Sequence, residues 1–366
     1  MEVRIDRNKI LEGVQKVQGI VEAKGAMPIL SYLLITTDAE GIHIQATDLE
    51  IGTKGFYDAN VITEGQVVLN ARKLYDIVRE LPSEEVHLVK QENHWVKIKC
   101  GKSVFQLPGM PAEDFPPFPE FSKESLIQFK GSELKEMIQK TVFAVSPDET
   151  RKSISGLLLE RDKERITMVG TDGHRLACIN RVASGSSGEK MTFLLAKKAL
   201  SELLKFIEDD TSDYIFSAKD NHLAFVHGRQ VLVSRAIDGS FPNYQQVIPK
   251  DNHLKVPVNK DNLLRALKRV ALLADEQSKM VRFEIQKGSL TLVSDNTELG
   301  TAKEELALEY NGEEMQIGLN ARYVLEILGG IDQEEIILNL KDKDHSCLIS
   351  LKGDKDYLSL VMPMRL

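Results

Sequence analysis

The chain repeats one pattern three times, and this repeat limits its possible folds more than any other feature of the sequence. Each copy contains a helix-like stretch that opens on an alanine: LNARKLYDIVREL (69–81), LLAKKALSELLKFI (194–207) and GLNARYVLEIL (318–328). The alanines Ala71, Ala196 and Ala321 are 125 residues apart both times. A fixed period of this kind indicates tandem copies of one structural unit.

Two further landmarks recur in the same order along the chain. One is an aspartate that follows an alternating apolar run, at Asp48, Asp172 and Asp295. The other is a stretch with helical periodicity near the start of each copy: NKILEGVQKV (8–17), SELKEMIQKTV (132–142) and DNLLRALKRVALL (261–273). We therefore predict three tandem domains, which span 1-122, 123-248 and 249-366.

Phe-Pro dipeptides mark the ends of the first two copies. Phe115-Pro116 and Phe241-Pro242 are 126 residues apart. Because proline fixes its own φ, we expect both to form rigid exits from one domain into the next. The third copy reaches the corresponding strand, YLSLVMPMRL (357–366), so we expect its last residues to have no following domain over them.

Within each copy the periodicity is mixed. Leu74, Ile77, Val78 and Leu81 fall on one face of a helix, and Asn70 stands where an N-cap residue belongs. Alternating runs such as those at 87–100 and 214–237 are typical of antiparallel hairpins. We therefore predict an α+β fold in which each domain has two helices and several antiparallel strands.

Composition places the chain among soluble globular proteins. The three cysteines, Cys100, Cys178 and Cys347, are far apart and form no CxxC pair, which argues against a disulfide framework and a structural zinc site. The N-terminus lacks the apolar core of a signal peptide, and no apolar run reaches the ~18 residues of a membrane span. We expect a cytoplasmic protein without a metal or cofactor.

The net charge of −8 normally argues against a nucleic-acid partner. However, lysine and arginine are concentrated in the six predicted helices, so the helices are net positive and the remainder of the chain is strongly acidic. One interpretation is the ordinary preference of lysine and arginine for helices. The other is a basic surface formed by helices of all three copies, which suits contact with DNA phosphates without sequence preference.

The second copy departs from its sister copies after its aspartate. Asp172-Gly173 between two alternating runs predicts a tight hairpin turn, but the following His174, Arg175 and Leu176 have no counterpart in the other copies. One hypothesis is a nucleic-acid-modifying enzyme that uses Asp172, His174 and Arg175 as acid, base and phosphate clamp. The chain has no GxSxG, P-loop or HExxH motif and no carboxylate cluster for two metals, so we favour a binding role.

The apolar ending VMPMRL (361–366) has two interpretations. It is either a last strand in a core or a surface built for contact, because soluble termini are usually polar. Methionine side chains repack easily, which suits a site for several partners.

Four segments together resemble the bacterial DNA polymerase III beta subunit family, the sliding clamps: TDGHRLA (171–177), DGSFPNYQQVIP (238–249), NARYVLEIL (320–328) and VMPMRL (361–366). The resemblance covers the whole chain. It implies a head-to-tail homodimer that closes a ring around double-stranded DNA, with helices inside and sheets outside. It also implies a non-catalytic processivity factor for DNA replication, which tethers the polymerase III catalytic subunit and binds the clamp loader, other polymerases and repair proteins through short peptide motifs.

The resemblance also assigns residues to three surfaces. DNA contact is implied for Lys24, Arg72, Arg79, Arg151, Lys197 and Lys198. A dimer interface is implied for Lys73, Lys102, Phe105, Leu107, Leu272, Leu273, Glu298 and Glu304. A cleft for partner peptides is implied for Ile154, Thr171, Gly173, His174, Arg175, Leu176, Pro242, Val247, Asn320, Tyr323, Leu360, Val361, Met362, Pro363, Met364 and Arg365. Gln246 stands where the family often has a basic residue, so partner preference is expected to differ there.

Overall fold

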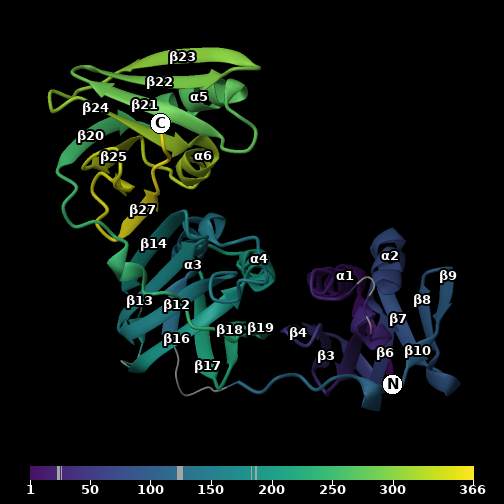
Figure 1. Cartoon of the computed structure of the whole chain (residues 1–366). Helices are drawn as coiled ribbons and strands as arrows, with labels where there is room; N and C mark the ends of the chain where they lie inside the picture. The colour runs from purple at the N-terminus through teal and green to yellow at the C-terminus, as the bar shows by residue number, and fades with distance from the viewer. Residues whose placement is uncertain (23–24, 26, 122–126, 183, 186–187) are drawn as a thin grey trace. The chain divides into compact units, whose positions relative to one another are not determined.

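The structure, a computed structural model, describes residues 1–22, 25, 27–121, 127–182, 184–185 and 188–366 (Figure 1). The chain divides into two compact units. Unit 1 comprises Met1–Gly131, Ser184–Ser186 and Lys198–Ala236, and unit 2 comprises Ser132–Ala183, Ser187–Lys197 and Ile237–Leu366. The second sequence repeat contributes to both units, because the sheets continue from one repeat into the next.

Unit 1 contains two antiparallel sheets. Sheet A has the order β5 (Asn60–Thr63), β1 (Glu2–Asp6), β7 (Glu85–Lys90), β8 (Val96–Cys100) and β9 (Ser103–Leu107). Sheet B has the order β10 (Gly109–Met110), β6 (Gln66–Asn70), β2 (Tyr32–Thr37), β3 (Gly41–Thr47), β4 (Ile51–Asp58), β19 (Gln230–Arg235), β18 (His222–His227), β17 (Asp213–Lys219), β11 (Ile127–Lys130) and β15 (Ser184–Gly185). Its helices are α1 (Arg7–Lys16), α2 (Ala71–Glu80) and nearly all of α4 (Lys197–Phe206).

Unit 2 is built in the same way. Sheet C has the order β16 (Gly188–Ala196), β12 (Gly156–Lys163), β13 (Arg165–Thr171), β14 (Arg175–Val182), β27 (Tyr357–Val361), β26 (Cys347–Leu351), β25 (Glu335–Leu340) and β20 (Leu254–Asn259). Sheet D has the order β23 (Gly300–Ala307), β22 (Ser289–Asn296), β21 (Met280–Gln286) and β24 (Met315–Asn320). Its helices are α3 (Gly131–Gln139, from Ser132 on), α5 (Lys260–Val270) and α6 (Ala321–Gly329).

The helices begin where the sequence predicts. Asp6, Asn70, Asn259 and Asn320 each accept a hydrogen bond from a backbone N–H of the first turn, which satisfies a donor that the helix itself leaves free. Several helices end earlier than predicted, and α5 passes at its end into a short 3₁₀ turn at Ala271–Leu273. The predicted α+β fold with antiparallel sheets is confirmed.

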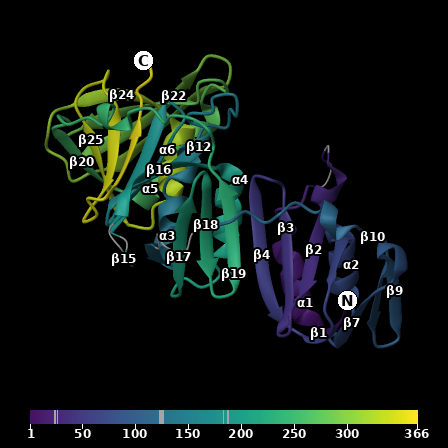
Figure 2. The same ribbon diagram turned by 90° about the horizontal axis from the view of Figure 1, so that it is seen from below.

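Two strand pairs carry the sheets across the repeat borders. In unit 1, β4 of the first repeat pairs with β19 of the second (Figure 2). In unit 2, β14 of the second repeat pairs with β27 of the third. We call these the first joint and the second joint. Both are antiparallel, and both follow directly on the turn that carries the repeated aspartate.

The core consists of apolar side chains on the sheet faces and on one face of each helix. Leu74 and Val78 of α2 are fully buried, as the helical periodicity predicts. The three cysteines are buried and unpaired. Within the described ranges, no helix is long and apolar enough to cross a membrane.

Candidate functional site

The turn between β13 and β14 is fixed by its own side chains. The Asp172 carboxylate accepts hydrogen bonds from the backbone N–H groups of His174 and Arg175, at 2.9 and 3.0 Å. The Thr171 hydroxyl donates to the Arg175 carbonyl at 2.6 Å and accepts from the Gly173 N–H at 3.1 Å. Gly173 has a φ of +91°, which a side chain would strain. The predicted Asp-Gly hairpin turn is therefore confirmed.

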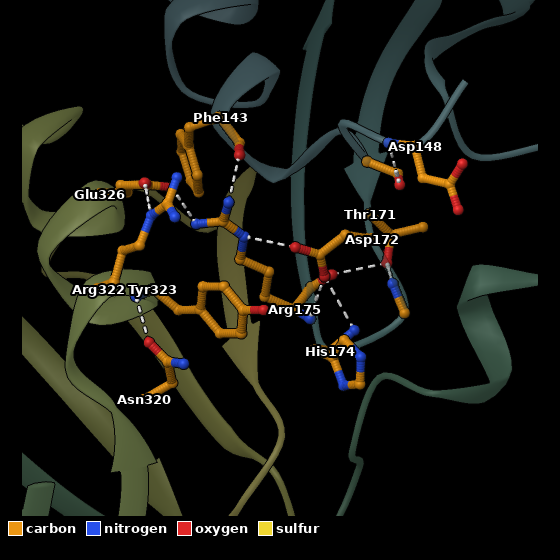
Figure 3. Close-up of polar contacts among 12 residues, drawn as sticks. Phe143, Asp148, Thr171, Asp172, His174, Arg175, Asn320, Arg322, Tyr323 and Glu326 are labelled. Carbon is orange, nitrogen blue, oxygen red and sulfur yellow. Dashed lines mark hydrogen bonds and ion pairs between the residues drawn. The ribbon is translucent and has the colours of Figure 1, made fainter. Parts of the chain in front are cut away.

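Arg175 points from this turn into the protein (Figure 3). Its guanidinium donates to Asp172 at 3.0 Å and to the Phe143 carbonyl at 2.7 Å, and it forms an ion pair with Glu326 of α6. The Tyr323 ring lies 4.4 Å from the guanidinium. With only 6% of its surface exposed, Arg175 joins the turn to α6. Its hydrogen-bonding groups face inward, and its implied role in the cleft stays a prediction.

Apolar residues of sheet C form the base of the site. Leu158, Val169, Leu176, Cys178 and Leu360 make one buried cluster, and Phe241, Tyr244 and Ile248 pack against it from the segment after β19. The Tyr244 hydroxyl donates to Glu160 at 2.9 Å and holds this segment to β12. Burial raises the pKa of the Cys178 thiol to about 12, so the thiol stays protonated.

The proposed cleft residues therefore separate into two groups. Ile154, Thr171, Leu176, Leu360 and Val361 are buried, and their implied role in the cleft stays a prediction. The 241–248 segment packs against the cluster that contains Leu176 and Leu360, and Val361 pairs with Arg175 in sheet C. The residues that reach the surface are Gly173, His174, Pro242, Val247, Met362 and Arg365, with Pro363 and Met364 half-buried.

The C-terminal residues are held at two points. The Met362 N–H donates to the His174 carbonyl at 2.9 Å, and the Met364 N–H donates to the Gly318 carbonyl at 2.8 Å. A Cβ at Gly318 would lie 2.9 Å from the Met364 carbonyl oxygen, so this approach requires glycine. The tail thus continues from sheet C to β24 of sheet D and leaves the Met362 side chain 44% exposed.

Asn320 and Tyr323 lie at the start of α6 (Figure 3). Asn320 accepts from the Tyr323 N–H as the N-cap and donates to the Ser278 carbonyl at 2.9 Å. The half-buried Tyr323 ring packs on Arg175. Both side chains thus have structural contacts beside the exposed tail.

Four of the residues expected at DNA, Arg72, Arg79, Lys197 and Lys198, lie on helices. Lys24 lies outside the described residues. Arg72 and Arg79 are exposed on α2, where they pair with Asp76 and Glu80.

The remaining three lie at the repeated turns. Arg151 donates to the Asp172 carbonyl at 3.2 Å. Burial and the nearby Arg175 lower the pKa of Lys197. Lys198 forms an ion pair with Asp48 and donates to the Ile20 carbonyl at 3.3 Å.

Five of the eight residues expected at the dimer interface lie on edge strands or in one short 3₁₀ helix. Phe105 and Leu107 are on β9, the edge strand of sheet A, and Glu304 is on β23, the edge strand of sheet D. Leu272, in the 3₁₀ turn after α5, is 77% exposed. Glu304 is held by Arg269 of its own chain, which lowers its pKa, so it is not a free carboxylate.

Other members of this set are less constrained. Lys73, Lys102 and Glu298 are exposed, and Leu273 is half-buried. Sequence reasoning missed Val104 and Leu299, which are 54% and 51% exposed on β9 and beside β23. Their signal was their place next to Phe105 and Glu298 in the sequence.

The geometry does not support the enzyme hypothesis. The Asp172 carboxylate is engaged by the turn and by Arg175, and Arg175 faces away from solvent. Within the described residues, no group of three or more His, Cys, Asp or Glu side chains could hold a metal ion. The arrangement instead offers an apolar, exposed contact surface over a rigid base.

Comparison with known proteins places the whole chain in one family. Sequence models of the N-terminal, central and C-terminal domains of the DNA polymerase III beta subunit match residues 1–119, 128–243 and 245–365. The beta sliding clamp of Pseudomonas putida is 31% identical over 367 residues, and that of Caulobacter vibrioides is 33% identical over 373 residues, with 100% of each chain covered.

Solved structures agree. The Pseudomonas aeruginosa sliding clamp bound to griselimycin superimposes with a TM-score of 0.96 at 30% identity over 100% of both chains. The Bacillus subtilis clamp gives a TM-score of 0.96 at 27% identity over 100% of this chain and 99% of that one. The chain therefore belongs to the DNA polymerase III beta subunit family, the beta sliding clamps.

Proposed function

We propose that two copies of this chain close head to tail into a ring around double-stranded DNA and tether a polymerase there for processive replication. Membership of the sliding-clamp family gives the function of a DNA sliding clamp, and the chain is not an enzyme. The observation that carries the ring is internal: the chain builds the same joint twice and leaves both halves of a third joint free.

Each internal joint follows one rule. The first strand residue after the repeated turn lies opposite the last or last but one residue of the next repeat's final strand. In the first joint, Ile51 is opposite Ser234. In the second joint, Arg175 is opposite Val361. In each joint, the residue after the strand-end member of the pair donates its N–H to the carbonyl of the residue before the other member. These hydrogen bonds run from Arg235 to Glu50 and from Met362 to His174.

The unused halves of this joint are β23 and β9. Gly300 opens β23, as Ile51 and Arg175 open β4 and β14. Leu107 ends β9, as Val361 ends β27, and the strand registers behind them agree. Phe105 pairs with Ile98 in sheet A, just as Ser359 pairs with Ile349 in sheet C. Exposed edges with free backbone groups are ready to pair with another chain.

We therefore place Gly300 of one copy opposite Leu107 of a second copy, and Ala302 opposite Phe105. A heterologous contact of this kind closes a ring when its rotation permits and otherwise forms a filament. The exposed Leu272 and half-buried Leu273 would be covered beside this strand pair.

The turns support the same arrangement. Asp48 contacts Lys198, and Arg175 packs on Tyr323. Lys198 and Tyr323 hold the same position, two residues after the repeated alanine of the next repeat. Lys73 holds that position in the first repeat. If the third joint forms in the same way, Lys73 lies beside the 296–299 turn of a second copy. That turn carries the exposed Glu298, which is the expected ionic partner of Lys73.

DNA contact is proposed for Lys24, Arg72, Arg79, Arg151, Lys197 and Lys198. Lysine and arginine contacts to phosphates carry no base information, so we expect binding that is independent of sequence and falls steeply with salt. A ring would hold DNA topologically even where each contact is weak.

Partner peptides from polymerases, the clamp loader and repair proteins are proposed to bind over the base formed by Leu176 and Leu360. Exposed His174, Pro242, Val247 and Met362 would contact the peptide, and Asn320 and Tyr323 would extend the site. A related structure supports binding of a ligand by clamps of this fold, since the Pseudomonas aeruginosa clamp was solved with griselimycin bound.

A cysteine pair tests the ring directly. Leu107→Cys with Gly300→Cys should cross-link two copies under oxidation, because opposite residues of an antiparallel pair without mutual hydrogen bonds lie about 4.5 Å apart at Cα. The native cysteines are buried and do not compete. Leu107→Cys with Lys303→Cys is the matched control, because Lys303 belongs to a different pair.

The functional readout is retention on DNA. Loaded by a clamp loader, the cross-linked ring should stay on nicked circular DNA and leave the same DNA after linearisation. Equal retention on both forms, or cross-linking of the control pair alone, would contradict the ring.

A further inference from the structure

We propose that unit 1 carries a second binding site, separate from the cleft, which takes an acidic partner segment with one large apolar side chain. The site is a hollow of about 500 Å³ beside the first joint. This volume is in the range of small-molecule and peptide side-chain sites. None of its lining residues belongs to the cleft, the dimer edges or the expected DNA contacts.

The hollow lies on the face of sheet B opposite α1. Gly13 of α1 packs against Ile44 and Tyr57, so these side chains mark the helix-covered face. Neighbouring strand residues point to opposite faces. His43 and Phe56, which line the hollow, therefore lie on the other side of the sheet.

The floor is a row of directly opposed residues that crosses the joint. Lys54 on β4 is opposite Val231 on β19, Val231 is opposite Val226 on β18, and Val226 is opposite Ile215 on β17. The three aliphatic side chains are only half-buried. The floor is thus an apolar surface that this chain leaves partly open.

The segment after the first Phe-Pro forms one wall. Phe118 and Phe121 line the hollow, and a Cβ at Gly52 would lie 3.2 Å from the Phe118 ring. Glu120 pairs with Lys219 at 2.8 Å, which ties this segment to the end of β17. Both aromatic rings remain half-buried, so they leave contact area for a ligand.

The charges around the hollow are unequal. Arg229 stacks on Phe56 at 3.2 Å and pairs with Glu40, and His43 pairs with Asp38. Lys54 is half-buried and, among the described residues, has no ion-pair partner within 4.0 Å. A half-buried ammonium beside an apolar floor attracts a carboxylate, and the apolar rings attract a large side chain.

This combination selects the occupant. A segment with tryptophan, phenylalanine or leucine beside aspartate or glutamate would fill the hollow and neutralise Lys54. A basic segment would meet Lys54 and Arg229 and be repelled. Charge complementarity therefore favours an acidic, aromatic-containing partner segment.

Two labelled pentapeptide probes test the site with the full chain. One has the sequence Gly-Glu-Trp-Glu-Gly with both ends capped, and the other has lysine in place of both glutamates. Fluorescence polarisation should show at least tenfold tighter binding of the acidic probe. Lys54→Glu should weaken acidic-probe binding at least tenfold, and Lys54→Arg should restore it to within about twofold of the unmodified chain.

Two control variants distinguish binding in the hollow from a general effect of net charge and from binding in the cleft. Lys287→Glu makes the same change of net charge on an exposed turn of unit 2 and should leave the affinity unchanged. Met362→Glu alters the cleft and should also leave it unchanged, so the outcome is independent of the proposed cleft. The proposal is overturned by absent binding, by equal affinity for both probes, by an unaffected Lys54→Glu, or by loss of binding in either control.

Discussion

The first and second joints have the same backbone hydrogen bonds at their turns but different side-chain contacts. In both, an aspartate caps the turn through the backbone N–H groups two and three residues later: Asp48 at 2.9 and 2.6 Å, and Asp172 at 2.9 and 3.0 Å. In both, a threonine hydroxyl, from Thr47 or Thr171, donates to the carbonyl that closes the turn. The first two repeats therefore stabilise the same turn conformation with the same residue types.

The residue that ends the turn differs. In the first joint it is the buried Ile51, and the ionic contact to the next repeat comes from Asp48 with Lys198, whose side chain is 46% exposed. In the second joint it is Arg175, which has three hydrogen-bond acceptors and a stacked ring while nearly buried. The second joint is thus held by a buried charge network, and the first by an apolar contact with an ion pair between the half-exposed Lys198 and the buried carboxylate of Asp48.

This difference separates residues that hold the second joint from residues that are available to a partner, which the sequence does not distinguish. The departure of His174-Arg175-Leu176 from the sister repeats indicated function. Arg175 departs because it builds the second joint, and Leu176 because it belongs to the buried apolar cluster beneath the proposed cleft. Only His174 is exposed for contact with a partner.

The largest expected effect concerns the third joint, which only a second copy can complete. Leu272→Ala with Leu273→Ala should give monomers, because each apolar side chain buried there contributes roughly 1.5–3 kcal/mol and a ring has two such joints. Sedimentation velocity measures the change. Val182→Ala, at another exposed apolar position, should stay dimeric. A double variant that remains dimeric would remove these leucines from the interface.

The next effect compares the two internal joints. Arg175→Ala leaves Asp172 and Glu326 without their buried partner and should lower the free energy of unfolding by about 3–5 kcal/mol. Lys198→Ala should cost less than Arg175→Ala, because the Asp48 carboxylate keeps its hydrogen bonds from the Glu50 and Ile51 N–H groups. Urea unfolding followed by circular dichroism gives both values. Equal losses would mean that the two joints are energetically alike despite their chemistry.

A smaller effect concerns the tail beyond the second joint. Removal of Met362 to Leu366 should weaken a polymerase-derived peptide at least tenfold, since losing one apolar anchor costs roughly 1.5–3 kcal/mol. The dimer should persist, because β27 ends at Val361. Fluorescence polarisation beside sedimentation measures both properties.

The single variant Met362→Ala serves as the control for the truncation. It keeps the hydrogen bond of Met364 to Gly318 but removes the exposed side chain. Weak peptide binding in both variants would assign the effect to Met362. Full affinity in the truncated dimer would exclude the tail from the site.

The sequence predicted the elements better than their contacts. Local signals, such as Asn70 as an N-cap and Asp172-Gly173 as a turn, were sufficient because their partners lie within four residues. The inward direction of Arg175 depends on Glu326, 151 residues away, which periodicity does not reveal. For the same reason, sequence alone did not show that the 241–248 segment packs against the apolar cluster of sheet C.

The smallest effect is the pH dependence of the second joint. Burial raises the pKa of Glu326, but hydrogen bonds from Arg322 and Arg175 outweigh it, so its pKa lies below the ordinary value of 4.5. A carboxylate whose pKa is lower in the folded state stabilises the fold at pH values above 4.5. That contribution is lost as the pH falls from 4.5 through the folded-state pKa. Glu326→Gln cannot titrate, so its unfolding midpoint in urea should fall less between pH 5 and pH 3 than that of the unmodified chain. Because the Glu326 side chain is 31% exposed, solvent screens the pair and the difference should be small. Parallel pH profiles of the two proteins would show that the buried network of the second joint does not depend on the charge of Glu326.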